Sequence, residues 1–348
     1  MQRKFPTAGW AHVGVGLCLI TAMSGGCGGE RTEEVVVYTA LDKEFSQPVL
    51  EQFTRETGIA VQAKYDVEST KSVGLTQRLL AERNRPRCDV FWNNEVVNTL
   101  RLDGAGLLAE HRSPAGEVFP PQYRATDGAW HGFAARARVL VVNTKLVAEL
   151  DRPASIRDLV DPKWRGRAGM AKPLAGTTAT HAACLFAAWG DEAAQEFFRA
   201  VKQNCRVMGG NKQVARAVAD GELAFGITDT DDAMVEIEAG MPVAIVYPDQ
   251  QGERALGTLL IPNTVAILQG APHRPAAERL VDYLLSPEVE RRLAAGPSAQ
   301  FPLNPAVRER SRAAPAEPLR AMEVDFAAAA VRWDAAAAFL RDEFATAE

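Results

Sequence analysis

The chain has 348 residues, of which 47% are hydrophobic and 24% are charged, and its formal net charge is -5. This length exceeds what one hydrophobic core usually organises, so we expect two lobes. The balance of charged and apolar residues excludes a wholly disordered, collagen-like or coiled-coil chain. The acidic net charge disfavours nucleic acid as a partner, because phosphate binding relies on clustered Lys and Arg.

The start of the chain resembles a bacterial secretion signal that ends in a lipobox. A positively charged start precedes an apolar run over 13–23, which is too short to span a bilayer but fits a signal peptide. Small residues then lead to Cys27, although Ser24 stands where a lipobox prefers Leu. We predict a signal peptide over 1–27, lipidation at Cys27 and a tether over 28–34, hence a periplasmic protein anchored to a membrane. The alternative is an ordinary secretory signal that is cut elsewhere.

Three cysteines follow this segment, and they are Cys88, Cys184 and Cys205. Their odd number and the lack of a CxxC pair leave two alternatives open. One is a single disulfide in an oxidising compartment, and the other is three buried thiols. The scattered histidines add no zinc-binding pattern to these cysteines.

Short apolar strands alternate with helices in the first third of the chain. Runs of β-branched and aromatic residues predict strands over 35–40, 59–65 and 88–92. One predicted helix ends at Gly58, and a second begins near Thr70. Strands that alternate with helices through short links indicate right-handed βαβ units and a parallel sheet.

Two long strand-like segments come later, over 132–143 and 257–267. Between them, predicted strands over 168–171, 223–227 and 243–247 alternate with helices, which indicates a second α/β lobe. Two extended crossings make a hinge, because strand ends absorb changes of φ and ψ while each core stays rigid.

We therefore predict an α/β fold of two lobes, each a mainly parallel sheet flanked by helices, joined by two hinge strands. Lobe 1 is assigned to 35–137 plus 264–348, and lobe 2 to 138–263. The Ala-rich stretch over 321–344 is predicted to be a helix, and this assignment places it in lobe 1.

Polar residues follow the predicted strands in both lobes. Ligands of parallel sheets bind beyond the carboxyl ends of the strands, so these loops can face each other across a cleft. Hydroxyl groups at a helix start either cap the helix or, with the N–H groups beside them, hold an anion. The predicted ligand-binding residues are Thr39, Ser69, Thr70, Asn94, Glu95, Arg136, Gly176, Thr177, Thr178, Thr228, Asp229, Thr230 and Asp231.

Carboxylates among these residues suggest a metal site. Glu95, Asp229 and Asp231 offer the hard oxygen ligands that such a site requires. The alternatives are an amine of the ligand or a solvated acidic loop that caps the next helix. We expect Arg136 and Arg138 to lie on opposite faces of the crossing strand, one in the cleft and the other at the surface.

Few signals of enzyme chemistry occur in the sequence. It contains no GxSxG, no Walker A loop and no HExxH. His131 and His181 lack a neighbouring nucleophile pattern. We predict that the chain is not an enzyme, and that any metal ion is bound as the ligand rather than as a cofactor.

Several segments carry a resemblance, and they occur in one order along the chain. They are VVYTA (36–40), CDVFWNNE (88–95), RARVLVVNT (136–144), LVDPKWRGR (159–167) and GTLLIPNTVA (257–266). With these segments the chain resembles bacterial solute-binding proteins of ABC importers, and more closely their ferric-iron-binding subfamily. The resemblance implies a two-lobe fold like that of periplasmic binding proteins, a ligand in the cleft, and delivery to the permease subunits. We expect a monomer.

The sequence departs from this subfamily at the ligand. Iron-binding members carry neighbouring tyrosines after the strand that corresponds to 223–227, whereas 228–232 here read TDTDD. The resemblance places Glu95 near a carboxylate ligand and 176–178 at an anion-binding helix start. The ligand stays open between ferric iron, another metal or anion, and a phosphonate or other small organic anion that carries an amine. A secreted enzyme on the same fold and a sensory domain are the rival classes.

Overall fold

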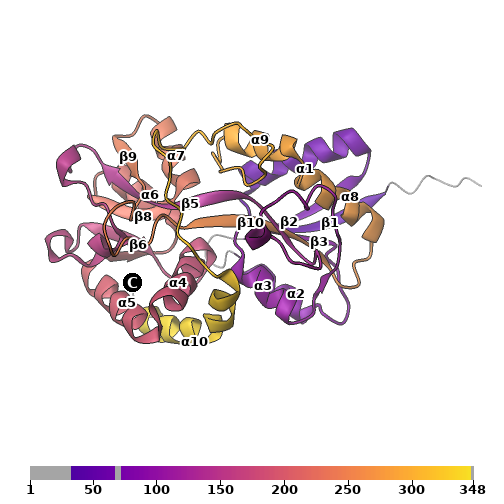
Figure 1. The fold of residues 1–348 in the computed structure, drawn as a ribbon, viewed down its shortest axis with the longest axis horizontal. Coiled ribbons are helices and arrows are strands. Elements are labelled where there is room, and N and C mark those ends of the chain that lie inside the picture. The colour runs from indigo at the N-terminus through magenta and orange to yellow at the C-terminus, as the bar shows by residue number, and fades with distance from the viewer. Residues whose placement is uncertain (1–32, 67–71, 346–348) are drawn as a thin grey trace, which may run out of the picture. The chain divides into compact units, whose positions relative to one another are not determined.

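The computed structural model describes residues 33–66 and 72–345 (Figure 1). The predicted signal peptide with its lipidation site Cys27 and the ligand candidates Ser69 and Thr70 lie outside the described residues. Within the described ranges, none of the helices has the length and apolar character needed to cross a membrane.

The first lobe begins with strands and helices in alternation, and these are β1 (Glu34–Thr39), α1 (Lys43–Thr57), β2 (Ala60–Tyr65), α2 (Val73–Ala81), β3 (Val90–Asn93), α3 (Val97–Gly104) and β4 (Leu108–Ala109). Strand β1 lies between β2 and β3 and is parallel to both. Helix α1 forms because Phe45, Val49 and Phe53 share one buried face, and it ends at Gly58, whose φ of +75° favours glycine. The predicted parallel sheet is confirmed here.

Strand β5 (His131–Asn143) runs through both sheets. Its first half pairs with β10 (Leu260–Leu268), and its second half pairs with β8 (Phe225–Asp229) and β9 (Val243–Val246), all antiparallel. The change of partner falls between Ala137 and Arg138. Because Leu260 pairs with Ala137, residues 260–263 belong to the sheet of the first lobe rather than to the second lobe as predicted.

The second lobe adds β6 (Ala168–Ala171), α4 (Gly176–Trp189), α5 (Asp191–Asn204), β7 (Arg206–Met208), α6 (Asn211–Ala219) and α7 (Thr230–Glu238). Its strands follow the order β5-β8-β6-β7, and β6 is parallel to β7 and β8. Helix α5 and strand β7 were not predicted. The predicted α/β class with two lobes is confirmed by the sheets and by the solved relatives described below.

The last helix contacts both lobes. After α8 (Arg274–Leu284) and α9 (Pro287–Ala295), which pack on the first lobe, α10 (Phe326–Phe344) contacts α3 of the first lobe and α4 and α5 of the second (Figure 1). Trp333 packs with first-lobe residues such as Leu102, whereas Leu340 and Phe344 join the second-lobe core. The assignment of this helix to lobe 1 alone is therefore wrong, because its apolar face is long enough to cover parts of both lobes.

The cysteines of the described chain are separate thiols. Cys88, Cys184 and Cys205 are free and buried, which decides between the alternatives left open by the sequence. Burial raises the pKa of each thiol, so all three stay protonated at neutral pH.

Candidate functional site

A cavity of about 820 Å³ lies where strands of the second lobe end and helices begin. Strands β6, β7 and β8 run parallel, so their carboxyl ends meet at the edge where such sheets bind ligands. Helices α4 and α6 start at this edge with Gly176 and Asn211. Asn94 of the first lobe and Arg136 of the hinge strand line the same cavity. A ligand in the cavity can therefore contact both lobes.

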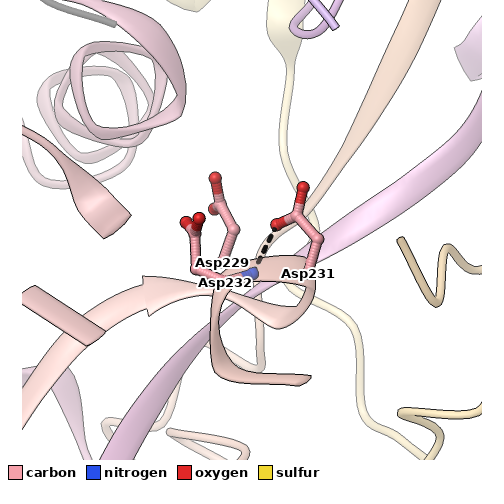
Figure 2. A group of neighbouring side chains, drawn as sticks. All are labelled: Asp229, Asp231 and Asp232. Atoms are coloured by element: carbon pink, nitrogen blue, oxygen red, sulfur yellow. Dashed lines mark hydrogen bonds between the residues drawn. The ribbon is translucent and has the colours of Figure 1, made fainter. Parts of the chain in front are cut away.

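Three aspartates around the start of α7 project to the same side of the chain (Figure 2). Asp229, Asp231 and Asp232 each place a carboxylate oxygen within 4.8 Å of the others, and all three line the cavity. Asp231 Oδ1 accepts a hydrogen bond of 3.1 Å from the backbone N–H of Asp232. Asp232 Oδ2 accepts one of 3.2 Å from the Thr228 hydroxyl. The predicted acidic loop is thus part of the cavity wall.

Two buried arginines neutralise much of this negative charge. Arg138 lies opposite Asp229 in the β5–β8 pairing, with Nη1 2.8 Å from Asp229 Oδ1. Arg136 Nη1 lies 3.5 Å from Asp229 Oδ2 and 3.4 Å from Asp231 Oδ2. The expectation that one arginine lies at the surface is wrong, since Arg136 is 2% and Arg138 1% exposed. Residues two apart on a strand share a face, so both side chains reach the aspartates.

Asp229 is held in its ionised form by the two arginines, and a hydroxyl and an amide add hydrogen bonds to it. Its Oδ2 accepts hydrogen bonds from Thr177 Oγ1 at 2.5 Å and from Asn211 Nδ2 at 3.1 Å. Burial by itself raises the pKa of Asp229, but Arg138 and Arg136 and the bond from Thr177 lower this pKa more strongly, so it lies below its usual value. Thr178 donates to Asn211 Oδ1 at 2.9 Å. The predicted threonines therefore tie the starts of α4 and α6 to β8.

The helix starts give one side of the cavity a positive potential. Neither α4 nor α6 receives a side-chain cap from any described residue. Gly176 begins α4 with a φ of +58°, a conformation that favours glycine. The N-terminus of a helix carries partial positive charge and N–H groups that attract anions, and Lys172 and Arg206 line the same cavity. The cavity therefore combines an anion-attracting side with an acidic side.

Four of the described site candidates do not line this cavity, and they are Thr39, Glu95, Thr228 and Thr230. Glu95 is buried and accepts hydrogen bonds from the Thr180 hydroxyl at 2.6 Å and from the Asn98 backbone N–H at 3.1 Å. Thr39 Oγ1 accepts a hydrogen bond from the backbone N–H of Leu41, and Thr230 Oγ1 accepts one from the backbone N–H of Ala137. Glu95 therefore does not join Asp229 and Asp231 as predicted for a metal site. Within the described chain, the third carboxylate close to these two belongs to Asp232.

Sequence reasoning missed two residues of the site. It assigned Arg138 no contact with the aspartates, and it did not select Asn211, which bonds both threonines and Asp229. No local pattern in the sequence indicated the contact of Arg138, because only the register of β5 on β8 sets this residue opposite Asp229. Asn211 directly precedes a segment over 212–219 in which Val214 and Val218 share one face of a helix, and this position was the available signal for a capping or ligand-facing amide.

Two α/β lobes joined by a shared strand, with a polar cavity that both lobes line, define a two-lobe solute-binding protein. The chain belongs to the family of bacterial extracellular solute-binding proteins, whose model matches residues 49–321. It is thus a solute-binding component of an importer, which binds a small ligand and delivers it to a permease. The predicted resemblance is confirmed.

Curated relatives span most of the chain. The "Major ferric iron-binding protein" of Neisseria meningitidis serogroup A is 28% identical over 279 residues, which cover 79% of this chain and 82% of that protein. The "Putative 2-aminoethylphosphonate-binding periplasmic protein" of Salmonella paratyphi A is 26% identical over 258 residues, which cover 72% of each chain. Both names describe a binding protein, and each gives a different ligand.

Solved structures share the fold. Iron-bound HitA from Pseudomonas aeruginosa matches with a TM-score of 0.78 at 24% identity, over 89% of this chain and 99% of that one. The periplasmic binding protein AfuA from Actinobacillus pleuropneumoniae, with exogenous fructose-6-phosphate bound, matches with a TM-score of 0.79 at 23% identity, over 90% of this chain and 99% of that one. At these identities the likeness concerns the fold alone.

Proposed function

We propose that this chain is the extracytoplasmic binding component of an ABC importer and that it captures its ligand in the cavity between α4, α6, α7 and β5. The observation that carries the proposal is that Asn94 of the first lobe, Arg136 of the hinge strand and Asp231 of the second lobe line one cavity. A ligand that binds better when both walls are close shifts the protein towards the closed state.

Ferric iron is the first candidate cargo. The Neisseria relative named above is a ferric iron-binding protein, and the carboxylates of Asp231 and Asp232 are hard oxygen ligands for such a cation. No tyrosine occurs among the described residues that line the cavity. Iron would therefore bind here with an accompanying anion placed at the starts of α4 and α6.

A phosphonate or small organic phosphate is the second candidate. It is favoured by the starts of α4 and α6 without side-chain caps, together with Arg136 and Lys172 in the same cavity. The acidic wall at Asp231 and Asp232 suits an amine at the other end of such a ligand. The names of the Salmonella and Actinobacillus proteins support this class.

Calorimetry and thermal unfolding of the purified protein test the proposal with ferric citrate, 2-aminoethylphosphonate and fructose 6-phosphate. We expect one of these to bind one-to-one and to raise the melting temperature by mass action. Asp231→Asn should weaken this binding, while Asp220→Asn, which changes an exposed aspartate of the same lobe paired with Arg216, should not. If none binds, or if both variants weaken binding equally, the cavity is not the binding site.

The proposed role needs binding and release without a covalent step, so we infer no enzymatic activity.

We also propose a monomer with a periplasmic location, held at the membrane through a lipid on Cys27, because the start of the sequence resembles a secretion signal. Cys27→Ser should move the protein from the membrane fraction to the soluble fraction after cell lysis. Membrane attachment that persists in this variant would refute the lipid anchor.

A further inference from the structure

Arg136 places a fixed positive charge among the aspartates of the cavity. Its Nη1 lies 3.4 Å from Asp231 Oδ2 and 3.5 Å from Asp229 Oδ2, and its side chain is 2% exposed. A guanidinium stays protonated under all conditions in which a protein is folded, so this charge cannot be titrated away. The group therefore lies where a cation held by these carboxylates would need to bind.

The charges around the aspartates leave little attraction for a bare multivalent cation. Asp229 is matched by Arg138 at 2.8 Å, and Arg136 lies between Asp229 and Asp231. A trivalent ion at the three aspartates would face a guanidinium at close range in a buried setting, where repulsion between like charges is weakly screened. Moving the Arg136 guanidinium away from the aspartates would also be costly, because a buried charge that has lost its partners is strongly unfavourable.

Polar atoms at this position lack partners within the described chain. Arg136 Nη2 donates to the backbone oxygen of Asn94, but Arg136 Nε and the Asn94 side-chain oxygen Oδ1 are buried without a hydrogen-bond partner. Both residues line the cavity. A buried polar atom without a partner costs free energy, and a ligand can supply the missing bond. Arg136 Nε requires an acceptor, such as an oxygen of an anion.

We infer that Arg136 sets the charge of the cargo: its guanidinium takes the cation position at the aspartates, so the cavity accepts its ligand as an oxyanion and not as a bare multivalent cation. This inference rests on the proposed importer function and narrows it. The oxyanion has two sources, a free phosphate or phosphonate and a ferric ion complexed by an organic acid. Iron can then be the cargo only as part of an anionic complex.

The test compares Tb³⁺ alone, measured by its luminescence, with 2-aminoethylphosphonate, ferric citrate and citrate, measured by calorimetry. The variants are Arg136→Gln, Arg136→Lys and the control Arg216→Gln, which removes an exposed arginine of the same lobe that pairs with Asp220 and does not line the cavity. We expect the wild type to bind an oxyanion but not Tb³⁺. Arg136→Gln should lose roughly 30-fold or more in oxyanion affinity, the effect of truncating a buried charged contact, and should bind Tb³⁺ at least about tenfold more tightly.

Arg136→Lys should keep Tb³⁺ out, and Arg216→Gln should behave like the wild type towards Tb³⁺ and towards the oxyanions. The inference is overturned if the wild type binds Tb³⁺ as tightly as Arg136→Gln does. If the wild type also binds an oxyanion, the proposed importer function still holds. The wild-type titration decides this even if Arg136→Gln fails to fold. If the wild type binds Tb³⁺ and none of the oxyanions, the inference is wrong and the cargo is a bare cation. If the wild type binds no probe at all, the proposed function fails and the inference with it.

Discussion

Buried histidines make the stability of the protein depend on pH. His181 of α4 is 6% exposed, and its burial together with the nearby Arg138 lowers its pKa from 6.5 to about 3. His131 of β5 is also buried, and its pKa is lowered to about 4. Both rings are therefore neutral in the folded protein at every pH above these values. In the unfolded chain, histidine takes up a proton near its ordinary pKa.

The sign of the effect follows from this difference. Since the unfolded state binds more protons below pH 6.5, the free energy of unfolding falls as the pH is lowered from 6.5 towards the folded pKa of His181. Between pH 7 and pH 5 this histidine should cost about 2 kcal/mol of stability. Urea unfolding at pH 7 and at pH 5 measures the loss of unfolding free energy between these pH values. This loss should be about 2 kcal/mol smaller in His181→Gln than in the wild type. A variant with the pH dependence of the wild type would contradict the lowered pKa.

At the residue scale, the sequence predicted several residues that line the candidate cavity, but not the contacts among their side chains. Thr177, Thr178, Asp229 and Asp231 were found because polar side chains after a buried strand or at a helix start are conspicuous in the sequence. The contact between Arg138 and Asp229 depends on the register of two strands that lie far apart in the chain. Such a register is set by tertiary packing and leaves no local pattern.

At the scale of elements, α10 ties the two lobes together. Leu340 on its buried face is 1% exposed, while Val331 on its outer face is 85% exposed. Leu340→Ala should lower the free energy of unfolding by about 2–5 kcal/mol, because the cavity it leaves lies in the second-lobe core. Chemical denaturation measures this loss. Val331→Ala on the same helix should change stability by no more than about 0.5 kcal/mol, and equal losses in the two variants would contradict the packing of α10.

Helices α6 and α1 meet across the cleft through an ion pair. Lys212 Nζ of α6 lies 2.9 Å from Asp42 Oδ2 and 3.1 Å from Glu44 Oε1, both at the start of α1. The lysine side chain is 43% exposed, so the pair is screened by solvent and worth at most about 1 kcal/mol. It nevertheless links the two lobes, so we expect it to favour the closed state.

Lys212→Gln should therefore weaken ligand binding by up to about fivefold in low salt, and the effect should vanish near 1 M salt. Calorimetry in both buffers measures it. The matched control is Arg216→Gln on the same helix, because Arg216 pairs with Asp220 and Glu236 inside the second lobe. Weaker binding in the control, or an effect of Lys212→Gln that persists in high salt, would exclude this role of the ion pair.

Most elements were predictable because each has a strong local signal. The valine-rich β1 and the amphipathic α1 follow directly from their side-chain patterns. Helix α5 was missed although Ala194, Phe197 and Val201 form an apolar face, because Gly190 was not taken as the boundary between two helices. The position of α10 across both lobes could not be predicted, since an Ala-rich helix pattern does not indicate which partners it packs on.

For the whole molecule, the two-lobe class followed from the alternation of strands and helices, interrupted by two long crossings. The identity of the ligand did not follow from the sequence, because the loop after β8 lacks the tyrosines that the resemblance implies and carries aspartates instead. What these aspartates do depends on Arg136 and Arg138, whose burial only the structure revealed. The fold therefore assigns the class of protein, and the charged groups of the cavity restrict its cargo.

Hydrogen exchange with and without ligand tests the central claim, which is that a small solute binds in the cavity and brings the lobes together. We predict that saturating 2-aminoethylphosphonate or ferric citrate slows exchange at the starts of α4 and α6, at 229–232 and at the residues around Asn94, which line the cavity from both lobes. The outer surface of α10 around Val331 should be unchanged. Protection limited to one lobe, or located away from the cavity, would contradict the account.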